Sequence, residues 1–369
     1  MSHYKIGCDA HRKYSQFAIL DHEGHFLQQV RVNHMPGAIR DFLEDYPPGT
    51  PVALETVGNW YWIVDEIEAA GCIPLMAHAA KAKVMMGNVN KTDKLDAEGL
   101  ATLLHLGSLP TVWLPSSEIR DERELHRTRM AFSKQRTALK NRMHSTLAKY
   151  ALSLDTNSDI FAPKWRPELT KACKALPPET QRCMHQHLVA LDHVQGQIKD
   201  LEERFKQRVE ATPNIQLLKT LPGVANILSI VIESEIGDVS RFPSSAQFAS
   251  YAGTVPTIKA SGGRIRYGRL RKQSNQYLKW ADKVASLEAA NVVVRQRRHP
   301  NWRDKHVTIL YERIRQRKGH SVAVGAVARH LSEAAFWMLR KQEPYKDPAR
   351  QAVTLGKGQR GPNMVQAKP

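Results

Sequence analysis

The stretch Tyr4-Lys-Ile-Gly-Cys-Asp9, followed by Gln16-Phe-Ala-Ile-Leu20, decides the fold expected of this chain. Both runs are short and apolar, which is typical of buried β-strands. Residues 26–32 alternate between apolar and polar side chains and predict a third strand, after a turn at His22-Glu23-Gly24. The chain is therefore expected to begin with a three-stranded sheet.

Helices and strands alternate after these three strands. The apolar patterns predict helices at 37–46, 59–70 and 92–106 and strands at 51–54 and 72–76. This order indicates an α/β layer fold. Because residues 107–117 have the composition of a connector, we expect a first domain over residues 1–115.

Two long helices are expected in the middle of the chain, at about 118–153 and 178–210. Apolar side chains recur every three or four residues along the second helix, at Leu188, Leu191, Val194, Ile198, Leu201 and Phe205. This spacing predicts a helical hairpin or coiled coil over residues 116–212. A hairpin packed within one chain and a dimer interface would both give this pattern.

The remaining sequence predicts a mostly helical domain over residues 213–342, with helices at 246–252, 275–295 and 321–340. Leu221-Pro-Gly-Val224 separates two apolar helical runs, as in a helix-hairpin-helix DNA-binding element, although Pro-Gly is also common in ordinary turns. Residues 343–369 lack an apolar period and predict a disordered tail. The fold class expected is thus α/β plus all-α.

Basic residues dominate the chain, which has 54 Lys and Arg against 36 Asp and Glu and a formal net charge of +18. Such a surplus predicts a polyanionic partner. Two stretches, 127–154 and 239–281, contain no acid. A charge run is often only a solvated face, but two blocks of a single sign favour contact with double-stranded nucleic acid. The candidate contacts are Arg127, Arg129, Lys134, Arg136, Lys140, Arg264, Arg266, Arg269, Arg271 and Lys272.

The same composition argues against a membrane or secreted protein. No apolar run approaches the roughly 20 residues of a spanning helix, and the N-terminus lacks a signal-peptide core. We therefore expect a cytoplasmic, nucleoid-associated protein with no membrane partner. The four cysteines form no CxxC pair, which favours reduced thiols. A zinc site at Cys173, Cys183, His185 and His187 is an alternative to polar residues on a helix face.

Four acids stand out against this basic background. Asp9 and Glu55 end predicted strands, and Asp93 and Asp96 are three residues apart on a predicted helix. Mg²⁺ prefers such carboxylate oxygens, and paired metal ions can activate the attacking oxygen and stabilise the leaving oxygen of a phosphodiester. Each acid also has a neutral explanation. Asp9 suits a turn, Glu55 suits a helix cap, and Asp93 and Asp96 suit the first turn of a helix.

Ser261 lies between a lysine-containing segment and Gly262-Gly-Arg264. Ser-Gly-Gly is most often a flexible loop. The glycines would also allow close approach of the backbone, and the neighbouring arginines could hold a phosphate. A serine hydroxyl needs a base or a metal to activate it, and no histidine is near in sequence. A metal bound elsewhere on the chain would meet that need.

With these motifs the chain resembles the DEDD-type insertion-sequence transposases, which carry a ribonuclease-H-like (RuvC-like) N-terminal domain and a C-terminal serine domain. These are the bridge-RNA-guided DNA recombinases. The matching segments are Ile6-Gly-Cys-Asp9, Ala53-Leu-Glu55-Thr-Val-Gly-Asn-Trp60, Asn90-Lys-Thr-Asp93-Lys-Leu-Asp96-Ala97, Leu221-Pro-Gly-Val224, Phe248-Ala-Ser-Tyr-Ala-Gly-Thr-Val-Pro256 and Ala260-Ser261-Gly-Gly-Arg-Ile-Arg-Tyr-Gly268.

The resemblance implies that Asp9, Glu55, Asp93 and Asp96 bind Mg²⁺ and that Ser261 forms a covalent phosphoserine intermediate with DNA. It also implies dimers that pair into tetramers on DNA, and a noncoding RNA that specifies the donor and target. Two other functions stay open. One is a Holliday-junction endonuclease that uses metal-activated water, and the other is a noncatalytic nucleic-acid-binding protein.

Overall fold

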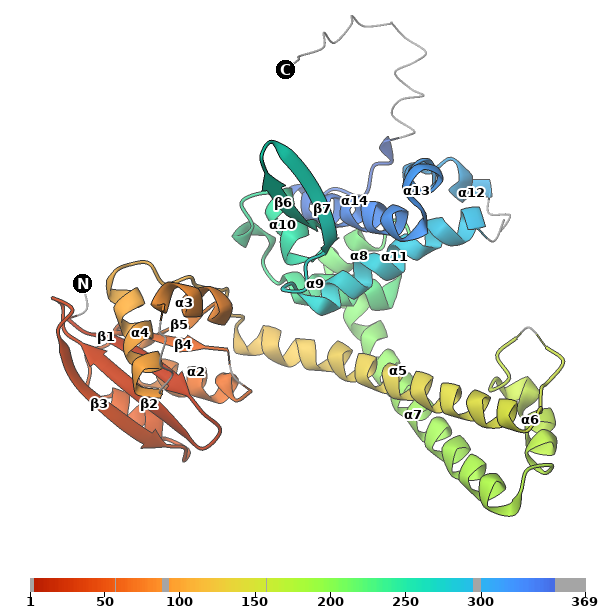
Figure 1. Ribbon diagram of the computed structural model, residues 1–369, viewed down its shortest axis with the longest axis horizontal. Helices are drawn as coiled ribbons and strands as arrows, with labels where there is room; N and C mark the ends of the chain where they lie inside the picture. Colours follow the sequence, from red (N-terminus) through yellow and green to blue (C-terminus); the bar gives the residue numbers. More distant parts are fainter. Residues whose placement is uncertain (1–2, 57, 88–92, 157, 295–299, 349–369) are drawn as a thin grey trace, which may run out of the picture. The chain divides into compact units, whose positions relative to one another are not determined.

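The computed structural model describes residues 3–56, 58–87, 93–156, 158–294 and 300–348, without the side chains of residues 93, 94, 211, 292, 294, 300 and 301. It divides the chain into two compact units, Met1–Ser116 and Ser117–Pro369 (Figure 1). In the described part of the chain, no helix is both long enough and apolar enough to cross a membrane.

The first unit is built around a five-stranded sheet with the order β3-β2-β1-β4-β5. Its strands are β1 (Lys5–Ala10), β2 (Tyr14–Leu20), β3 (Phe26–Asn33), β4 (Pro51–Glu55) and β5 (Ile73–Ala77). The pairs β1–β2 and β2–β3 are antiparallel, whereas β1–β4 and β4–β5 are parallel. The predicted strands are therefore confirmed, and the fourth strand lies next to the first.

Helices cover both faces of this sheet. Ile6, Cys8, Val52 and Leu54 pack with α1 (Ala38–Leu43) and α2 (Trp60–Ala69) on one face. Ala53 and Ala77 pack on the other face with α3 (Ala79–Met86) and α4 (Asp93–His105). Helix α3 was not among the predicted elements, because its short sequence has only a weak apolar period.

Gly7 explains how closely α4 approaches the sheet. A Cβ atom at this position would lie 2.0 Å from the carbonyl oxygen of Ala97 and 2.6 Å from the amide nitrogen of Ala101. The helix backbone therefore lies directly on strand β1 at a point where only glycine leaves room.

In the second unit, α5 (Ser117–Lys149) and α7 (Pro178–Ala211) form a helical hairpin (Figure 1). Near the far end of the hairpin, Met143 and Leu147 pack against Met184, Leu188 and Leu191 together with the short helix α6 (Arg166–Cys173), which follows the 3₁₀ turn η1 (Pro163–Trp165). This contact favours one of the two alternatives that the sequence left open, a hairpin packed within one chain.

The other elements of this unit surround α14 (His320–Lys341) and α11 (Gln276–Val294). They are α8 (Pro213–Leu218), α9 (Asn226–Ile236), η2 (Val239–Arg241), α10 (Ser245–Tyr251), β6 (Pro256–Ser261), β7 (Arg264–Leu270), α12 (Pro300–Arg303) and α13 (His306–Lys318). Their shared core contains Phe248, Leu278, Tyr311 and Phe336. The mostly helical character was predicted, whereas the strands of the β6–β7 hairpin were not, because Ser-Gly-Gly is most often part of a loop.

Two segments of this unit bear on earlier predictions: the turn expected to contact DNA and the start of the tail expected to be disordered. Gly223, in the turn between α8 and α9, has a φ of +81°, and a Cβ there would lie 2.4 Å from the carbonyl oxygen of Ala285. The turn thus packs against α11, and contact with DNA stays a prediction. At the start of the expected tail, the Tyr345 amide donates to Thr220 Oγ1 and the His306 amide donates to Asp347, so residues 343–347 are attached to the folded unit.

Candidate active site

Asp9 and Glu55 lie at the same edge and on the same face of the sheet. Gly7 pairs with Ala53 and Cys8 with Leu54 in the parallel register of β1 and β4. Because side chains alternate along a strand, Asp9 shares the face of Gly7, and Glu55 shares the face of Ala53. This is the face covered by α4, and it places two acids at the carboxyl ends of neighbouring parallel strands.

Helix α4 carries the other two predicted metal ligands. Asp96 is half-buried and directly precedes Ala97, the residue whose carbonyl oxygen lies over Gly7. Asp93 is the first residue of the helix, and its side chain lies outside the described part. The close packing of α4 on β1 thus places Asp96 on the helix that covers the Asp9 and Glu55 face.

The described carboxylates do not form a closed metal cage. The ligand atoms of Asp9, Glu55 and Asp96 do not all lie within 4.8 Å of one another, and of the described residues only Asp21, Glu23 and His25 meet this distance. Those three lie in an exposed turn, where Asp21 accepts the backbone N–H groups of Glu23 and His25. By their chemistry, Asp9, Glu55 and Asp96 still fit a hard divalent cation, since all three supply carboxylate oxygens.

His11 belongs to this edge and was missed from the sequence. Its Nε2 lies 3.1 Å from Asp9 Oδ2, and its ring stacks at a tilt on Tyr14 with centroids 4.7 Å apart. The Asn59 side chain donates to the carbonyl oxygen of His11 over 3.1 Å, which joins the loops that follow β1 and β4. The Asp-x-His spacing after a strand was the available signal.

Ser261 is the last residue of β6 and sits at the tip of a two-stranded hairpin. It pairs with Arg264 across a two-residue loop in which Gly262 and Gly263 have φ angles of +55° and +72°. Two positive φ angles define the type I′ turn that suits a tight hairpin, and they explain the Gly-Gly pair. Ser261 is exposed, and no side-chain hydrogen bond joins it to another described residue.

The hairpin has two chemically different faces. Lys259 pairs with Arg266, and Ser261 pairs with Arg264, so these four side chains share one face. The other face carries Ile258, Ala260, Ile265 and Tyr267, and both strands are exposed along most of their length. We call this β6–β7 hairpin the serine ribbon. It presents the serine among cations, on the face where a phosphate would be attracted.

The predicted nucleic-acid contacts fall into two groups. Arg264, Arg266, Arg269, Arg271 and Lys272 are exposed on or beside the serine ribbon. On α5, Lys134 is exposed and Arg136 is half-buried. In contrast, the Arg129 guanidinium donates to Glu202, and Lys140 pairs with Asp159. Arg127 donates through both Nε and Nη2 to Glu235. These three cations have partners inside the protein, and their contact with nucleic acid stays a prediction.

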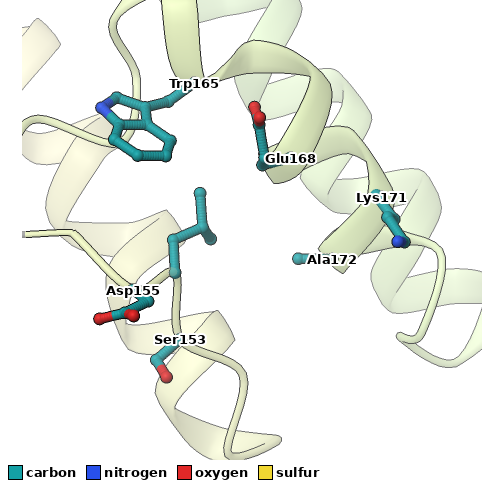
Figure 2. A pocket seen from close by; sticks show the side chains of 7 residues that line it. Ser153, Asp155, Trp165, Glu168, Lys171 and Ala172 are labelled. Atoms are coloured by element: carbon teal, nitrogen blue, oxygen red, sulfur yellow. The ribbon is translucent and has the colours of Figure 1, made fainter.

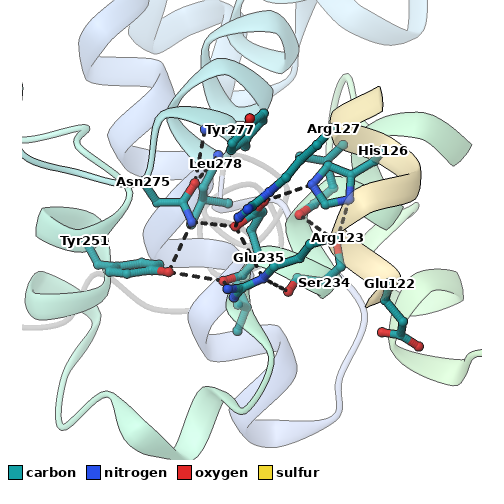
Figure 3. A network of polar contacts seen from close by, with 12 residues as sticks. Glu122, Arg123, His126, Arg127, Ser234, Glu235, Tyr251, Asn275, Tyr277 and Leu278 are labelled. Carbon is teal, nitrogen blue, oxygen red and sulfur yellow. Dashed lines mark hydrogen bonds and ion pairs between the residues drawn. The ribbon is translucent and has the colours of Figure 1, made fainter. Parts of the chain in front are cut away.

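Glu235 is the centre of a buried polar network that the sequence did not reveal (Figure 3). Its carboxylate is fully buried and accepts hydrogen bonds from His126 Nε2, Arg127 and Asn275, with the amide of Asn275 at 2.7 Å. Burial pushes the pKa of Glu235 upward, but the bonds from His126 and Arg127 and the charges of Arg123 and Arg127 outweigh it and lower the pKa to about 2. Glu235 is therefore ionised at neutral pH. An acid within the apolar run of α9 was the signal for this network.

A separate hollow of about 450 Å³ lies near the far end of the helical hairpin (Figure 2). Its lining includes Ser153, Asp155, Trp165, Glu168 and Lys171, and no predicted catalytic residue takes part. The cysteines are free thiols, and Cys173, Cys183, His185 and His187 do not form a ligand group within the described part. Neither the hollow nor this set of cysteines and histidines contributes to the candidate active site.

Comparison with known proteins identifies the class of this chain. A DEDD transposase model of the IS110 type matches residues 6–152, which include Asp9, Glu55, Asp93 and Asp96. The chain is thus a transposase of the DEDD type. A second model, described as "Transposase IS116/IS110/IS902 family", matches residues 215–306, which include Ser261. The two matches place the chain in the IS110/IS116/IS902 family of transposases.

Individual relatives agree with this assignment at low identity. The chain is 25% identical to a probable family 20 transposase of Pseudomonas aeruginosa over 93% of its own length and 98% of that protein. It is 25% identical to the transposase for insertion sequence element IS1111A of Coxiella burnetii over 70% of the chain and 69% of that protein. It is 23% identical to the transposase for IS1328 of Yersinia enterocolitica over 74% and 80% of the two lengths.

Proposed function

We propose that this transposase cuts and rejoins DNA strands with Ser261 as the nucleophile and with Mg²⁺ held by Asp9, Glu55, Asp93 and Asp96 on a ribonuclease-H-like domain. The observation that carries the proposal is the serine ribbon. It presents an exposed hydroxyl at a tight turn, on the same face as Lys259, Arg264 and Arg266. A nucleophile that attacks a polyanion needs this combination of access and positive charge.

The proposed reaction exchanges one phosphodiester for another. The Ser261 oxygen attacks phosphorus and loses its proton to a base, the bond from phosphorus to a DNA oxygen breaks, and that oxygen takes up a proton. A DNA hydroxyl then attacks the phosphoserine and releases Ser261, so no external energy source is needed. When bound, Mg²⁺ would lower the barrier by neutralising charge on the phosphate and the two oxygens.

In this proposal, residues of the first unit bind the metal ion. Asp9 and Glu55 supply carboxylates from neighbouring strand ends, and α4 supplies Asp96 and the first-turn Asp93. His11, bonded to Asp9, holds that carboxylate in one orientation. We propose further that the enzyme works on double-stranded DNA as dimers pairing into tetramers and that a noncoding guide RNA selects donor and target.

Covalent trapping tests the proposal. Purified protein with its co-purified RNA, Mg²⁺ and DNA carrying the element's ends is expected to give a denaturation-resistant protein–DNA adduct. Ser261→Ala should abolish this adduct, while Ser153→Ala, at an exposed serine of the helical hairpin, should leave it unchanged. Hydrolysed DNA ends formed equally by wild type and Ser261→Ala would instead identify a nuclease that uses water. Ribonuclease treatment before the assay tests the guide RNA, because it should abolish strand exchange.

A further inference from the structure

The serine ribbon is held from its base. Both strands are exposed along most of their length, and an isolated two-stranded hairpin is only marginally stable in water. At its base, the backbone N–H of Asn275 donates to the Tyr251 carbonyl oxygen over 2.9 Å, and the backbone N–H of Arg271 donates to the Val255 carbonyl oxygen over 3.3 Å. Tyr251 and Asn275 therefore bound the segment that carries Ser261, one on each side.

Both bounding residues contact the same third residue, Glu235 (Figure 3). The side-chain amide of Asn275 donates to Glu235 Oε2 over 2.7 Å and to the Tyr251 hydroxyl oxygen over 3.1 Å. The Tyr251 hydroxyl donates to the carbonyl oxygen of Glu235 over 3.3 Å. One buried residue thus fixes both ends of the segment.

Glu235 is itself held in one position by side chains from α5. Arg127 binds both carboxylate oxygens, at 2.9 and 3.0 Å, and His126 Nε2 lies 2.9 Å from Oε1. Arg123 donates to the carbonyl oxygens of Ser234 and Glu235 at the end of α9, where helix carbonyls otherwise lack partners. A buried carboxylate satisfied by several donors is rigid, because any shift leaves a charge without its partners.

We propose that Glu235 is a positioning residue for Ser261, acting through Asn275 and Tyr251 as a clamp on the base of the serine ribbon. This inference rests on the proposed role of Ser261 as the nucleophile. Six residues at about 3.3 Å each make the ribbon about 20 Å long, so a tilt of about 3° at its base moves the tip by about 1 Å. A displacement of about 1 Å can slow a reaction by about 100-fold.

Asn275→Ser is the sharpest test of this clamp. The Asn275 side chain also caps α11, since its Oδ1 accepts the amides of Tyr277 and Leu278. Serine is an equally good cap but is too short to reach Glu235, so this variant removes the clamp and keeps the helix start. Tyr251→Phe removes only the hydroxyl. Glu235→Gln keeps the shape of Glu235 and removes its charge. Glu202→Gln is the matched control, because Glu202 pairs with Arg129 of the same helix α5 but contacts neither Asn275 nor Tyr251 in the described part.

Two measurements on the full-length protein test whether Glu235 positions Ser261 through Asn275 and Tyr251. In single-turnover adduct formation, Asn275→Ser and Tyr251→Phe are expected to react at least about tenfold more slowly at saturating DNA, with an unchanged dissociation constant for DNA. In hydrogen–deuterium exchange without DNA, the amides of residues 256–270 should exchange about tenfold faster in both variants and in Glu235→Gln, but not in Glu202→Gln.

Each outcome bears on the proposal. Wild-type adduct rates, or unchanged exchange of residues 256–270, in a folded Asn275→Ser protein would overturn the clamp. Equal slowing by Glu202→Gln would do so too, because the effect would then be a general loss of stability. If the wild type forms no Ser261-dependent adduct, the proposed nucleophile fails, and the exchange measurement alone still decides whether Glu235 holds the ribbon.

Discussion

Asp9 and Glu55 lie at or next to the ends of strands that are packed on both faces, whereas Ser261 ends a strand that is exposed on both faces. The acids are located by the sheet register and by the contact of α4 with Gly7. The serine is located by a tight turn at one end of a ribbon and by a polar clamp at the other. This difference suits the proposed roles, since fixed carboxylates can bind a metal ion and a projecting serine can reach a DNA duplex.

The largest effect on DNA cleavage should follow from a change in the packed sheet that carries Asp9 and Glu55. Asp9→Asn removes one carboxylate charge from the strand edge and is expected to slow DNA cleavage by at least about 100-fold, because a bound divalent cation would be held less well. Thermal unfolding should be little changed, since asparagine keeps an oxygen that can accept from His11. Asp21→Asn is the control, because Asp21 lies in the exposed turn between β2 and β3. Equal cleavage by Asp9→Asn and wild type in Mg²⁺ would remove Asp9 from the catalytic site.

Gly7→Ala tests the contact that brings α4 to the acids. The new Cβ would clash with backbone atoms of Ala97 and Ala101, which cannot yield without moving the helix. We expect a loss of about 2–3 kcal/mol in the free energy of unfolding, measured by denaturant titration. Gly58→Ala is the matched control, because a Cβ there meets nothing within 4 Å. If the two variants were equally stable, the close packing of α4 on β1 would be wrong.

Much of the packed sheet that carries Asp9 and Glu55 could be predicted from sequence, whereas little of the exposed serine ribbon could be. Apolar runs, strand order and the acids at strand ends all follow from burial, which imposes a pattern on sequence. The serine ribbon has two solvated faces, so its sequence resembles a loop, and only Gly262-Gly263 signals its turn. Glu235 was missed because its role depends on a partner 109 residues away, His126. His11 lies two residues from Asp9, and this short spacing was a signal that the sequence interpretation did not use. Asp93 was identified by motif, and its side chain lies outside the described residues.

The pH dependence of stability distinguishes two buried acids at the foot of the serine ribbon. Asp282 accepts from Ser332, whose hydroxyl oxygen lies 3.2 Å from Thr254 Oγ1, just before β6. Burial raises the pKa of Asp282 to about 7, although the bond from Ser332 lowers it. The folded protein therefore binds a proton more readily than the unfolded chain, and Asp282 destabilises the fold increasingly as the pH rises from about 4 to about 7.

The contribution of Glu235 to stability depends on pH in the opposite direction. Its pKa of about 2 lies below the ordinary value of 4.5, so its contribution to stability is complete above about pH 4.5 and is lost as the pH falls towards 2. Asp282→Asn should accordingly raise the free energy of unfolding at pH 8 by up to about 4 kcal/mol, since each unit of pKa shift corresponds to about 1.4 kcal/mol, and should have little effect at pH 4. Chemical denaturation at both pH values checks this. A variant that loses stability at pH 8 would mean that Asp282 has a cationic partner.

The smallest effect concerns the charges of the exposed region. Arg266 lies on the face of the serine ribbon that carries Ser261, whereas Arg129 is bonded to Glu202 with a side chain only 11% exposed. Each arginine that contacts a DNA phosphate contributes about one unit to the slope of log affinity against log salt. Arg266→Ala should lower this slope by about one unit in a salt titration of duplex binding. Arg129 was also predicted to contact nucleic acid, but because its guanidinium is bonded to Glu202, we expect Arg129→Ala to leave the slope unchanged and to lower stability instead. The reverse result would place the DNA path along the helical hairpin rather than across the ribbon, and Ser261 would then face solvent in the complex.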